Sequence, residues 1–211
     1  MENDTPNKIK ISKEIIATLP IETFPGKIVV IDNEKDADNA VLQLNNERII
    51  GFDTETRPTF KKGKSNHVAL IQLSTHDTCY LFRINRIGFT PAIKNLIENE
   101  SLLKVGISLK DDFCMLSRLN GGQFIPRNFI ELQKFVKKYN IEDQSLQKIY
   151  GIVIGKKISK GQRLSNWEAD HLTENQQLYA ATDAWSCIKI YEVLKSGKFK
   201  SPIYKIQPSS L

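Results

Sequence analysis

The sequence predicts an α/β domain, because strand-like and helix-like stretches follow one another along most of its 211 residues. Three strand-like runs come in close succession, at 48–54, 67–74 and 78–83. From Thr90 onward helix and strand patterns alternate, which is typical of a sheet covered by helices. Hydrophobic residues make up 40% of the chain and charged residues 26%, as expected for a globular protein with a buried core.

The first half of the chain is expected to build much of the sheet and one covering helix. A strand is predicted at 27–31, and 33–46 has the apolar spacing of an amphipathic helix. Only three residues separate the runs at 67–74 and 78–83, which favours a hairpin. Together with 48–54 they form a predicted meander of three consecutive strands.

A long final helix is predicted for the second half of the chain. It begins after Thr173, where Gln176 completes a capping box, and stops near Gly197. A basic, loop-rich segment at 151–165 precedes it. The other expected elements are helices at 91–99, 109–119 and 135–150 and strands at 102–107 and 129–132.

We expect one domain, 27–197, between an N-terminal extension, 1–26, and a C-terminal tail, 198–211. The extension is predicted to hold a short helix over 11–19. No apolar run reaches the length of a membrane span, and the polar start does not resemble a signal peptide. The chain is therefore expected to be soluble and cytoplasmic, with no membrane partner.

Charge and cysteine content narrow the classes of partner and site. A net charge of +6 and a pI near 9.1 favour a polyanionic partner. The three cysteines are far apart and lack zinc-ligand spacing, so we expect buried thiols and no disulfide framework. They are Cys79, Cys114 and Cys187.

Asp53 and Glu55 form the acidic pair around which the chemistry is organised. They are two residues apart in a strand, so both side chains point to one side, with Cα atoms roughly 7 Å apart. Two carboxylates that close repel each other unless a cation lies between them or one is protonated. Mg²⁺ prefers such oxygen ligands. For this pair alone, a solvated strand end is the simpler interpretation.

Further acids come from two predicted helices. Asp112 falls on the apolar arc of its helix, where it is a candidate metal ligand or the partner of a buried base. Asp111 points to the opposite side and is expected to be solvated. Tyr179 and Asp183 share a face of the last helix, about 6 Å apart along its axis. A local hydrogen bond explains that pair alone, but four acids from three elements indicate a common site.

These residues stand in contexts that resemble the 3′-5′ exonucleases of the Asp-Glu-Asp-Asp class, in the subtype with a tyrosine four residues before the last aspartate. The resemblance covers roughly 48–195, is greatest to Werner-type exonuclease domains, and extends more distantly to ribonuclease D. It implies a ribonuclease H-like fold, with a five-stranded mixed β-sheet flanked by helices on both faces. The contexts are GFDTE at 51–55, VALIQL at 68–73, VGI at 105–107 leading to Asp112, SNW at 165–167 and LYAATDA at 178–184.

The resemblance implies hydrolysis of phosphodiester bonds from a 3′ end, with release of nucleoside 5′-monophosphates and two divalent ions, Mg²⁺ or Mn²⁺, as cofactors. It makes Asp53, Glu55, Asp112 and Asp183 metal ligands, with Asp53 between the two ions. Tyr179 would orient the attacking water, because a phenol of pKa about 10 is a poor base at neutral pH. The segment 131–134 lacks an aspartate that the resemblance leads us to expect, which questions a supporting contact.

The implied partner is nucleic acid with a free 3′ end, DNA favoured over RNA, with a separate helicase to open duplexes. Thr54 is expected to contact the terminal nucleotide through its backbone. Phosphate contacts are expected from basic residues that lie near the acidic motifs in sequence, although each alone is more often a solvated charge. These basic residues are Arg57, Lys61, Lys160 and Arg163.

Three alternatives stay open. A catalytically silent nucleic-acid-binding module on the same fold would gain no stability from Mg²⁺ or Mn²⁺. A phosphoesterase for small molecules would be indifferent to salt, which weakens phosphate-backbone binding. An RNA-trimming exoribonuclease is the alternative within the class, because no motif shows a contact to the sugar 2′-hydroxyl.

Overall fold

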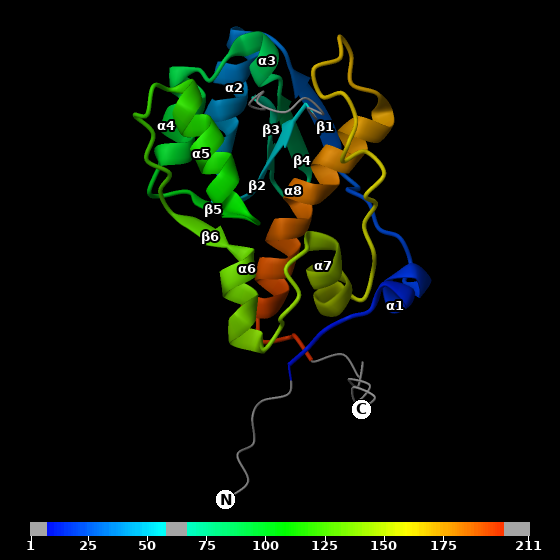
Figure 1. The fold of residues 1–211 in the computed structure, drawn as a ribbon. Coiled ribbons are helices and arrows are strands. Elements are labelled where there is room, and N and C mark those ends of the chain that lie inside the picture. Colours follow the sequence, from blue (N-terminus) through cyan, green and yellow to red (C-terminus); the bar gives the residue numbers. More distant parts are fainter. Residues whose placement is uncertain (1–7, 58–66, 201–211) are drawn as a thin grey trace, which may run out of the picture.

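A six-stranded mixed sheet lies at the centre of the computed structural model, which describes residues 8–57 and 67–200 (Figure 1). Its order is β1-β4-β3-β2-β5-β6. The predicted meander is present as antiparallel β2, β3 and β4, while β1 joins β4, β5 joins β2 and β6 joins β5 in parallel. The strands are β1 (Lys27–Ile31), β2 (Ile49–Thr56), β3 (Val68–Ser74), β4 (Thr78–Phe82), β5 (Leu103–Gly106) and β6 (Phe129–Glu131).

The implied strand count of five is wrong, because the sheet has six strands. The residue patterns taken one by one already predicted all six. The outer strands are β1, which pairs with β4 from Lys27 opposite Thr78, and the three-residue β6. Each outer strand hydrogen-bonds backbone groups of its inner neighbour that would otherwise lack a partner within the sheet.

Helices cover both faces of the sheet, as predicted (Figure 1). On one face α8 packs across the strands together with α7, and on the other α2, α4 and α5 cover a second apolar cluster. Successive side chains of β2 point to opposite faces of the sheet. Ile50 and Phe52 point to the face covered by the second cluster, and Gly51, which lies between them, is on the face covered by α8. The helices are α1 (Lys13–Thr18), α2 (Glu34–Leu44), α3 (Ile84–Ile87), α4 (Pro91–Glu98), α5 (Leu109–Leu119), α6 (Leu132–Phe135), the 3₁₀ turn η1 (Val136–Tyr139), α7 (Leu146–Ile154) and α8 (Glu174–Lys195).

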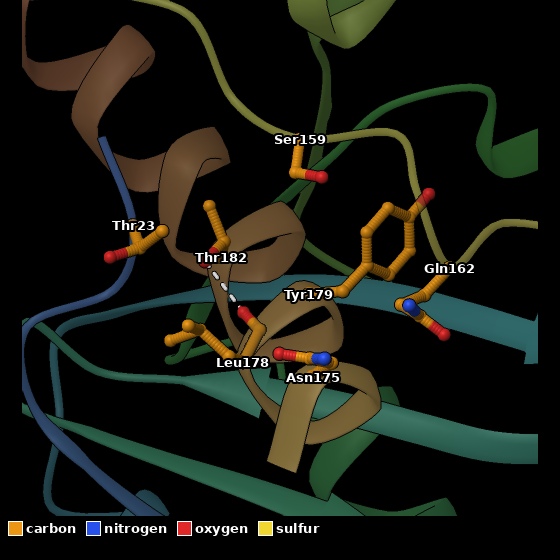
Figure 2. A pocket seen from close by; sticks show the side chains of 7 residues that line it. All are labelled: Thr23, Ser159, Gln162, Asn175, Leu178, Tyr179 and Thr182. Carbon is orange, nitrogen blue, oxygen red and sulfur yellow. Dashed lines mark hydrogen bonds between the residues drawn. The ribbon is translucent and has the colours of Figure 1, made fainter. Parts of the chain in front are cut away.

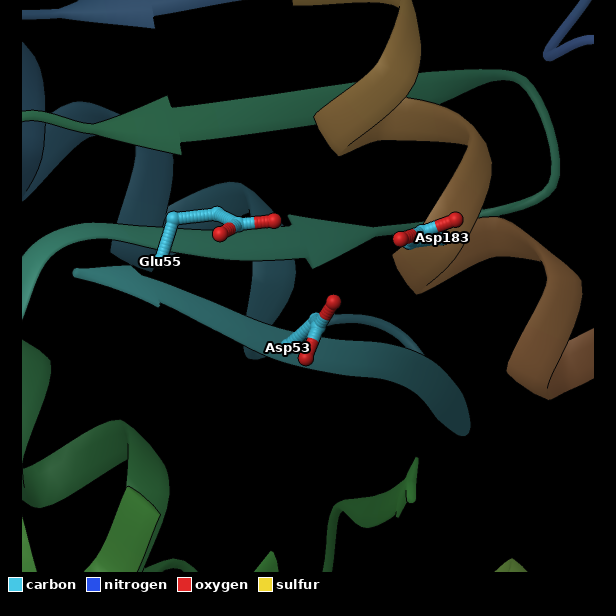
Figure 3. Close-up of side chains that lie close together, drawn as sticks. All are labelled: Asp53, Glu55 and Asp183. Atoms are coloured by element: carbon cyan, nitrogen blue, oxygen red, sulfur yellow. The ribbon is translucent and has the colours of Figure 1, made fainter. Parts of the chain in front are cut away.

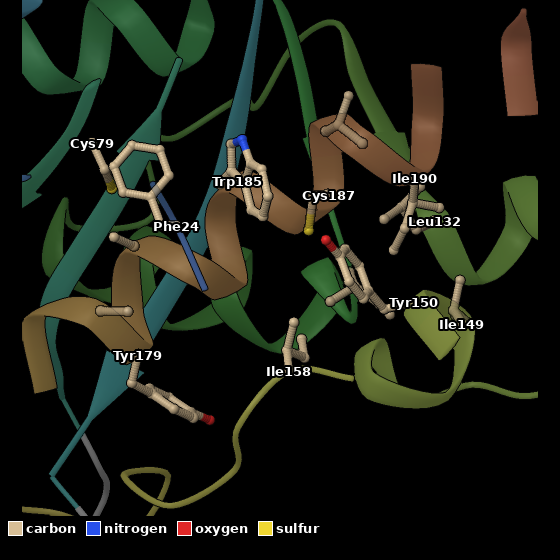
Figure 4. Close-up of a cluster of buried hydrophobic side chains, with 14 of the residues drawn as sticks. Phe24, Cys79, Leu132, Ile149, Tyr150, Ile158, Tyr179, Trp185, Cys187 and Ile190 are labelled. Atoms are coloured by element: carbon tan, nitrogen blue, oxygen red, sulfur yellow. The ribbon is translucent and has the colours of Figure 1, made fainter. Parts of the chain in front are cut away.

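The long helix α8 is the main positioning element on its face. Thr173 and Gln176 form the predicted capping box at its start, and Gly197, with φ +69°, follows its end. Figure 4 shows how side chains from α6, α7 and the 158 loop surround it, with Trp185 and Cys187 buried among them. This burial around much of its circumference holds the helix in one rotational position.

Close packing of α8 on β2 depends on Gly51. A Cβ atom added there would lie 1.9 Å from the carbonyl oxygen of Ala184, so the helix backbone rests directly on the strand. Any side chain at Gly51 would push α8 outward, and with it Asp183, the neighbour of Ala184. This one glycine therefore sets how near α8 comes to the acidic strand.

The helix predicted at 135–150 is wrong, because the chain breaks in its middle. Asn140 has φ +60° and ends the 3₁₀ turn, an irregular stretch follows, and α7 begins only after Ser145. The predicted loop over 151–165 accordingly starts late, after Gly155 at φ +73°. A left-handed residue at each point ends the helix.

Two of the three cysteines are buried as expected, and the third is not. Cys79 and Cys187 are buried, whereas Cys114 lies on the exposed side of α5. Among the residues that the structure describes, no helix is long and apolar enough to cross a membrane.

Part of the stretch assigned to the N-terminal extension packs onto the sheet and α8. Ile11, Ile16 and Phe24 are buried in the same cluster as α7 and α8. Glu22 receives ion pairs from Lys156 and Lys189 at 2.6 and 2.8 Å. These contacts join the segment before β1 to the elements that carry the last acidic motif.

Candidate active site

Asp53 and Glu55 of β2 meet Asp183 of α8 in one cluster (Figure 3). One carboxylate oxygen from each residue lies within 4.8 Å of those of the other two. Because β2 continues to Thr56, the strand acids do not stand at a solvated strand end. Glu55 and Asp183 are each only 9% exposed.

The charged forms of these three acids are costly in the protein alone. Burial, then the charges of Asp183, Glu55 and Asp112, raise the pKa of Asp53 well above its usual value. Burial, followed by the charges of Asp183 and Asp112, raises the pKa of Glu55 to about 9. Burial raises the pKa of Asp183 to about 7, against an opposing hydrogen bond from Tyr179 and the charge of Lys160. Oxygen ligands packed at this separation fit a divalent cation, which would remove their repulsion.

Asp112 reaches the same cleft from the other layer. Thr54 points to the side of the sheet opposite its two acidic neighbours, and its hydroxyl donates a 2.5 Å hydrogen bond to Asp112 on α5. Burial raises the pKa of Asp112 to about 6, which the Thr54 hydrogen bond partly offsets. Asp112 lies outside the cluster of three, because it approaches from the far side of β2. Its neighbour Asp111 is exposed, as predicted.

Glu131 supports the helix that carries Asp112. Its carboxylate accepts backbone hydrogen bonds from Ser108 at 3.1 Å and Leu109 at 2.8 Å, at the first turn of α5. A negative group here satisfies free N–H groups and interacts favourably with the helix dipole. The segment that lacks the expected aspartate therefore still makes a supporting contact, through Glu131. Sequence reasoning overlooked Glu131, although an acid at the end of a strand was visible.

Tyr179 stands beside the acids on α8. Its ring packs on Trp167 with centroids 6.0 Å apart, and the side chain is 7% exposed. Burial, followed by the charges of Asp183, Glu55 and Asp53, raises the pKa of Tyr179 far above its usual range. The phenol is therefore a neutral hydrogen-bond donor at any physiological pH.

A cleft of about 330 Å³ contains all five candidate catalytic residues. Lys160 and Arg163 also line it, and their charges favour ionisation of Asp183 and Glu55 respectively. Arg57 does not line it and pairs instead with Glu168 at 3.1 Å. Lys61 lies outside the described residues. The cleft is lined by Asp53, Thr54, Glu55, Ile107, Ser108, Asp111, Asp112, Gln144, Ser145, Leu146, Gln147, Ile158, Ser159, Lys160, Arg163, Tyr179 and Asp183.

A second, uncharged cavity of about 270 Å³ adjoins the cleft at Ser159 and Tyr179 (Figure 2). The Thr182 hydroxyl, on its wall, donates to the Leu178 carbonyl at 2.6 Å. Sequence patterns gave no sign of this cavity, because its walls come from three segments far apart in the chain.

The sequence and the fold of the chain match those of known proteins. The model of a 3′-5′ exonuclease family matches residues 28–197. The chain belongs to this 3′-5′ exonuclease family. It is 33% identical over 208 residues to the bifunctional 3′-5′ exonuclease/ATP-dependent helicase WRN of Mus musculus, covering 90% of this chain and 14% of that protein. A 3′-5′ exonuclease of Arabidopsis thaliana is 28% identical over 192 residues, covering 83% of this chain and 66% of its own length.

Solved structures of this exonuclease fold superpose well on the chain. The Nibbler EXO domain of Aedes aegypti has a TM-score of 0.74 at 23% identity, covering 83% of this chain and 91% of that one. RNase D of Escherichia coli has a TM-score of 0.72 at 20% identity, covering 82% of this chain and 45% of that one. At these identities the likeness establishes the fold. The match spans only 14% of the length of the mouse relative and 66% of the length of the Arabidopsis relative.

Proposed function

We propose that the chain is a metal-dependent 3′-5′ exonuclease that removes nucleoside 5′-monophosphates from the 3′ end of nucleic acid. The observation that carries this proposal is the cluster of Asp53, Glu55 and Asp183 beside a neutral Tyr179. Membership of the 3′-5′ exonuclease family supports the same activity.

The donor set fits divalent ions. It consists of carboxylates only, partly to fully buried, with raised pKa values that a cation would bring back down. We assign Asp53 to both of two Mg²⁺ or Mn²⁺ ions, Glu55 and Asp183 to the first, and Asp112 to the second. When bound there, such ions would supply Lewis-acid chemistry, making the attacking water more acidic and the leaving 3′-oxygen more stable.

The protein's own residues then position the reactants. Once Asp183 holds an ion, the Tyr179 hydroxyl would donate its one proton to the attacking water in place of Asp183 and so orient that water, because the proton is held too tightly for the phenol to act as a base. Thr54 keeps Asp112 turned into the cleft. Lys160 and Arg163, beside the acids, place positive charge where phosphate oxygens would lie.

We favour DNA as the substrate, with a separate helicase to open duplexes. The mouse relative is named as both a 3′-5′ exonuclease and a helicase, which supports the pairing with a helicase, while the choice of DNA follows the resemblance of the sequence to Werner-type domains. The alternative is RNA trimming, supported by the fold of Trypanosoma brucei RNase D, a structure described as a complex with RNA U12. Identity to that chain is 19%, so only its fold bears on the question.

The test is degradation of single-stranded and recessed-end DNA, with matched RNA, labelled at either end, in Mg²⁺ and in Mn²⁺. Wild-type protein would run beside Asp53→Ala and Asp183→Ala. We expect a ladder that shortens from the 3′ end and disappears with EDTA and in both variants. Faster degradation of RNA than of DNA would show that RNA, and not DNA, is the preferred substrate.

Asp38→Ala is the matched control, since this acid is exposed on α2 and does not line the cleft. It should retain nearly full activity. If folded wild-type protein cleaves no strand in either metal, the enzyme proposal fails; absence of thermal stabilisation by Mn²⁺ would then favour a silent nucleic-acid-binding module.

A further inference from the structure

A groove of about 510 Å³ lies beside the active-site cleft, and its walls carry three lysines. We call it the lysine groove; it is lined by Lys8, Lys10, Lys137, Asn140, Glu142 and Gln144, with Ile141 at its base. None of these residues belongs to the acidic cluster.

The N-terminal segment builds one wall of the lysine groove. Ile9 forms an isolated parallel bridge with Ile141, through hydrogen bonds from its N–H to Asn140 at 2.8 Å and from Glu142 to its carbonyl at 3.1 Å. In an extended segment, residues two apart point to the same side. Lys8 and Lys10 therefore face the groove together.

The charge of the lysine groove is net positive. Glu142 is its one acid among the lining residues, and it pairs with Lys8 at 2.5 Å and Lys10 at 3.0 Å. Lys8 and Lys10 remain 67% and 66% exposed, so their ammonium groups stay open to a ligand. Lys137 is exposed on η1 and forms no ion pair with any residue that the structure describes.

The lysine groove and the acidic cleft share a wall at Gln144. This wall is held in place by Gln133, whose side-chain amide donates to the Ser108 hydroxyl at 2.9 Å and to the Gln144 carbonyl at 3.0 Å. Ser108 also lines the cleft. The two hollows are thus neighbours along one surface.

We propose that the lysine groove binds the sugar–phosphate backbone of the substrate strand upstream of the bond that is cleaved. This inference rests on the proposed exonuclease function. Lys160 and Arg163 bring positive charge to the cleft itself, and the lysines of the adjoining groove extend this attraction for a polyanion. A strand held there would bring its 3′ end past Gln144 to the acids. Its described lining residues offer charge and include no aromatic side chain, so the groove would hold phosphates without reading bases.

The test compares a long strand with a substrate too small to reach the lysine groove. Binding of a labelled single strand of about 20 nucleotides, longer than one such site, is measured by fluorescence anisotropy in EDTA at several salt concentrations. Turnover of the p-nitrophenyl ester of thymidine 5′-monophosphate is measured in Mn²⁺. The variant is Lys10→Ala/Lys137→Ala, and the control is Lys27→Ala/Lys35→Ala, which removes equal charge at β1 and α2, beside the opposite edge of the sheet.

We expect the Lys10→Ala/Lys137→Ala variant to bind the strand about tenfold more weakly, with a salt slope smaller by about 1.4 for two lost phosphate contacts. Its turnover of the small ester should equal that of wild type, and the control should bind normally. Equal weakening in both variants, an equal loss on the small ester, or no strand binding by wild type would each overturn the inference. Strand binding through these lysines without hydrolysis of either substrate would overturn the exonuclease function but would still support the groove as a binding site for the strand.

Discussion

Thr54 donates its hydroxyl proton to the Asp112 carboxylate across a 2.5 Å hydrogen bond, although 58 positions separate the two residues. The bond joins β2, which carries two of the acids, to α5, which carries a third. Because Thr54 lies between Asp53 and Glu55 on the strand, its side chain points to the opposite face. A residue we singled out for its backbone therefore links the two halves of the site through its side chain.

Thr54→Val should shift the pH dependence of the reaction. Burial holds the pKa of Asp112 at about 6 against the Thr54 hydrogen bond, so loss of that bond raises the pKa further. Less Asp112 is then ionised near pH 6, so the proton competes better with the metal for this carboxylate, and at limiting metal the acid limb of the rate profile moves to higher pH. We expect about a tenfold loss near that pH, in line with about 1.5–3 kcal/mol for a hydrogen bond to a charged group. Thr54→Ser keeps the hydroxyl and should behave as wild type; an unmoved limb in the valine variant would refute the link.

Tyr179→Phe should lower kcat by roughly 10²–10³-fold with little change in KM, because one donor to the reacting water is lost. The ring keeps its contact with Trp167, so the thermal midpoint should change little. The wild-type pH profile should show no limb from this tyrosine, since burial raises its pKa beyond the range in which enzymes are assayed. An activity loss that tracks unfolding would contradict the proposed role.

Metal binding should stabilise the protein more as pH rises. Without metal, the folded state holds more protons on Glu55 and Asp183 than the unfolded state, because burial raises their pKa values to about 9 and about 7. That contribution to stability is complete below the unfolded values near 4 and is lost as pH rises through 7 to 9. Because metal binds the ionised acids, the stability that the protein gains from metal increases as pH rises. Thermal midpoints in EDTA and in Mn²⁺, from about pH 5.5 to about pH 8.5, measure the difference.

The same experiment has a sharp control. Asp183→Asn removes one ionisable ligand, so the metal-free protein should lose less stability with rising pH and gain little from Mn²⁺. A metal-induced shift that is equal at all pH values, or equal in wild type and variant, would show that the cluster is not the binding site.

Glu22→Gln should loosen the N-terminal segment. Burial opposes ionisation of Glu22, but hydrogen bonds from Lys156, Lys189 and Tyr150 outweigh it and lower its pKa to about 2. We expect a loss of about 1 kcal/mol in the free energy of unfolding at neutral pH, because Lys156 is 43% exposed and its charge is screened.

This contribution is present above the unfolded pKa of Glu22, near 4.5, and is lost as pH falls toward 2. Urea unfolding at about pH 7 and about pH 3 should therefore show a difference between wild type and Glu22→Gln that shrinks in acid. Glu47→Gln, at an exposed position, is the control and should change stability little. A difference that grows in acid would contradict the ion-pair account.

Local periodicity was enough to predict several features of the site. The two-residue spacing of Asp53 and Glu55 set them on one side of a strand, and the four-residue spacing of Tyr179 and Asp183 set them on one face of a helix. The capping box at Thr173 and the apolar position of Asp112 were equally readable, because each depends on residues within a few positions.

Breaks and distant partners were not readable in the same way. The left-handed Asn140 that ends η1 carried no pattern strong enough to interrupt the predicted helix at 135–150. In the sequence, Glu131 was noted only as part of a segment that lacks an expected aspartate. Its role was missed because only the folded chain shows that its carboxylate reaches the start of α5. The faces of β2 from which Asp183 and Asp112 approach likewise depend on how α8 and α5 pack against the sheet.

By itself the sequence determined the six strands and most of the longer helices of this protein, its family contexts and the order of its four acids, because these are short-range properties of the chain. Only the tertiary structure decided that Asp53, Glu55 and Asp183 meet within 4.8 Å while Asp112 stands apart, held by Thr54. It also decided that Lys160 faces the cleft while Arg57 pairs with Glu168. The physical reason is packing: the approach of α8 over Gly51 and of α5 against the opposite face of β2 sets distances that no local pattern contains.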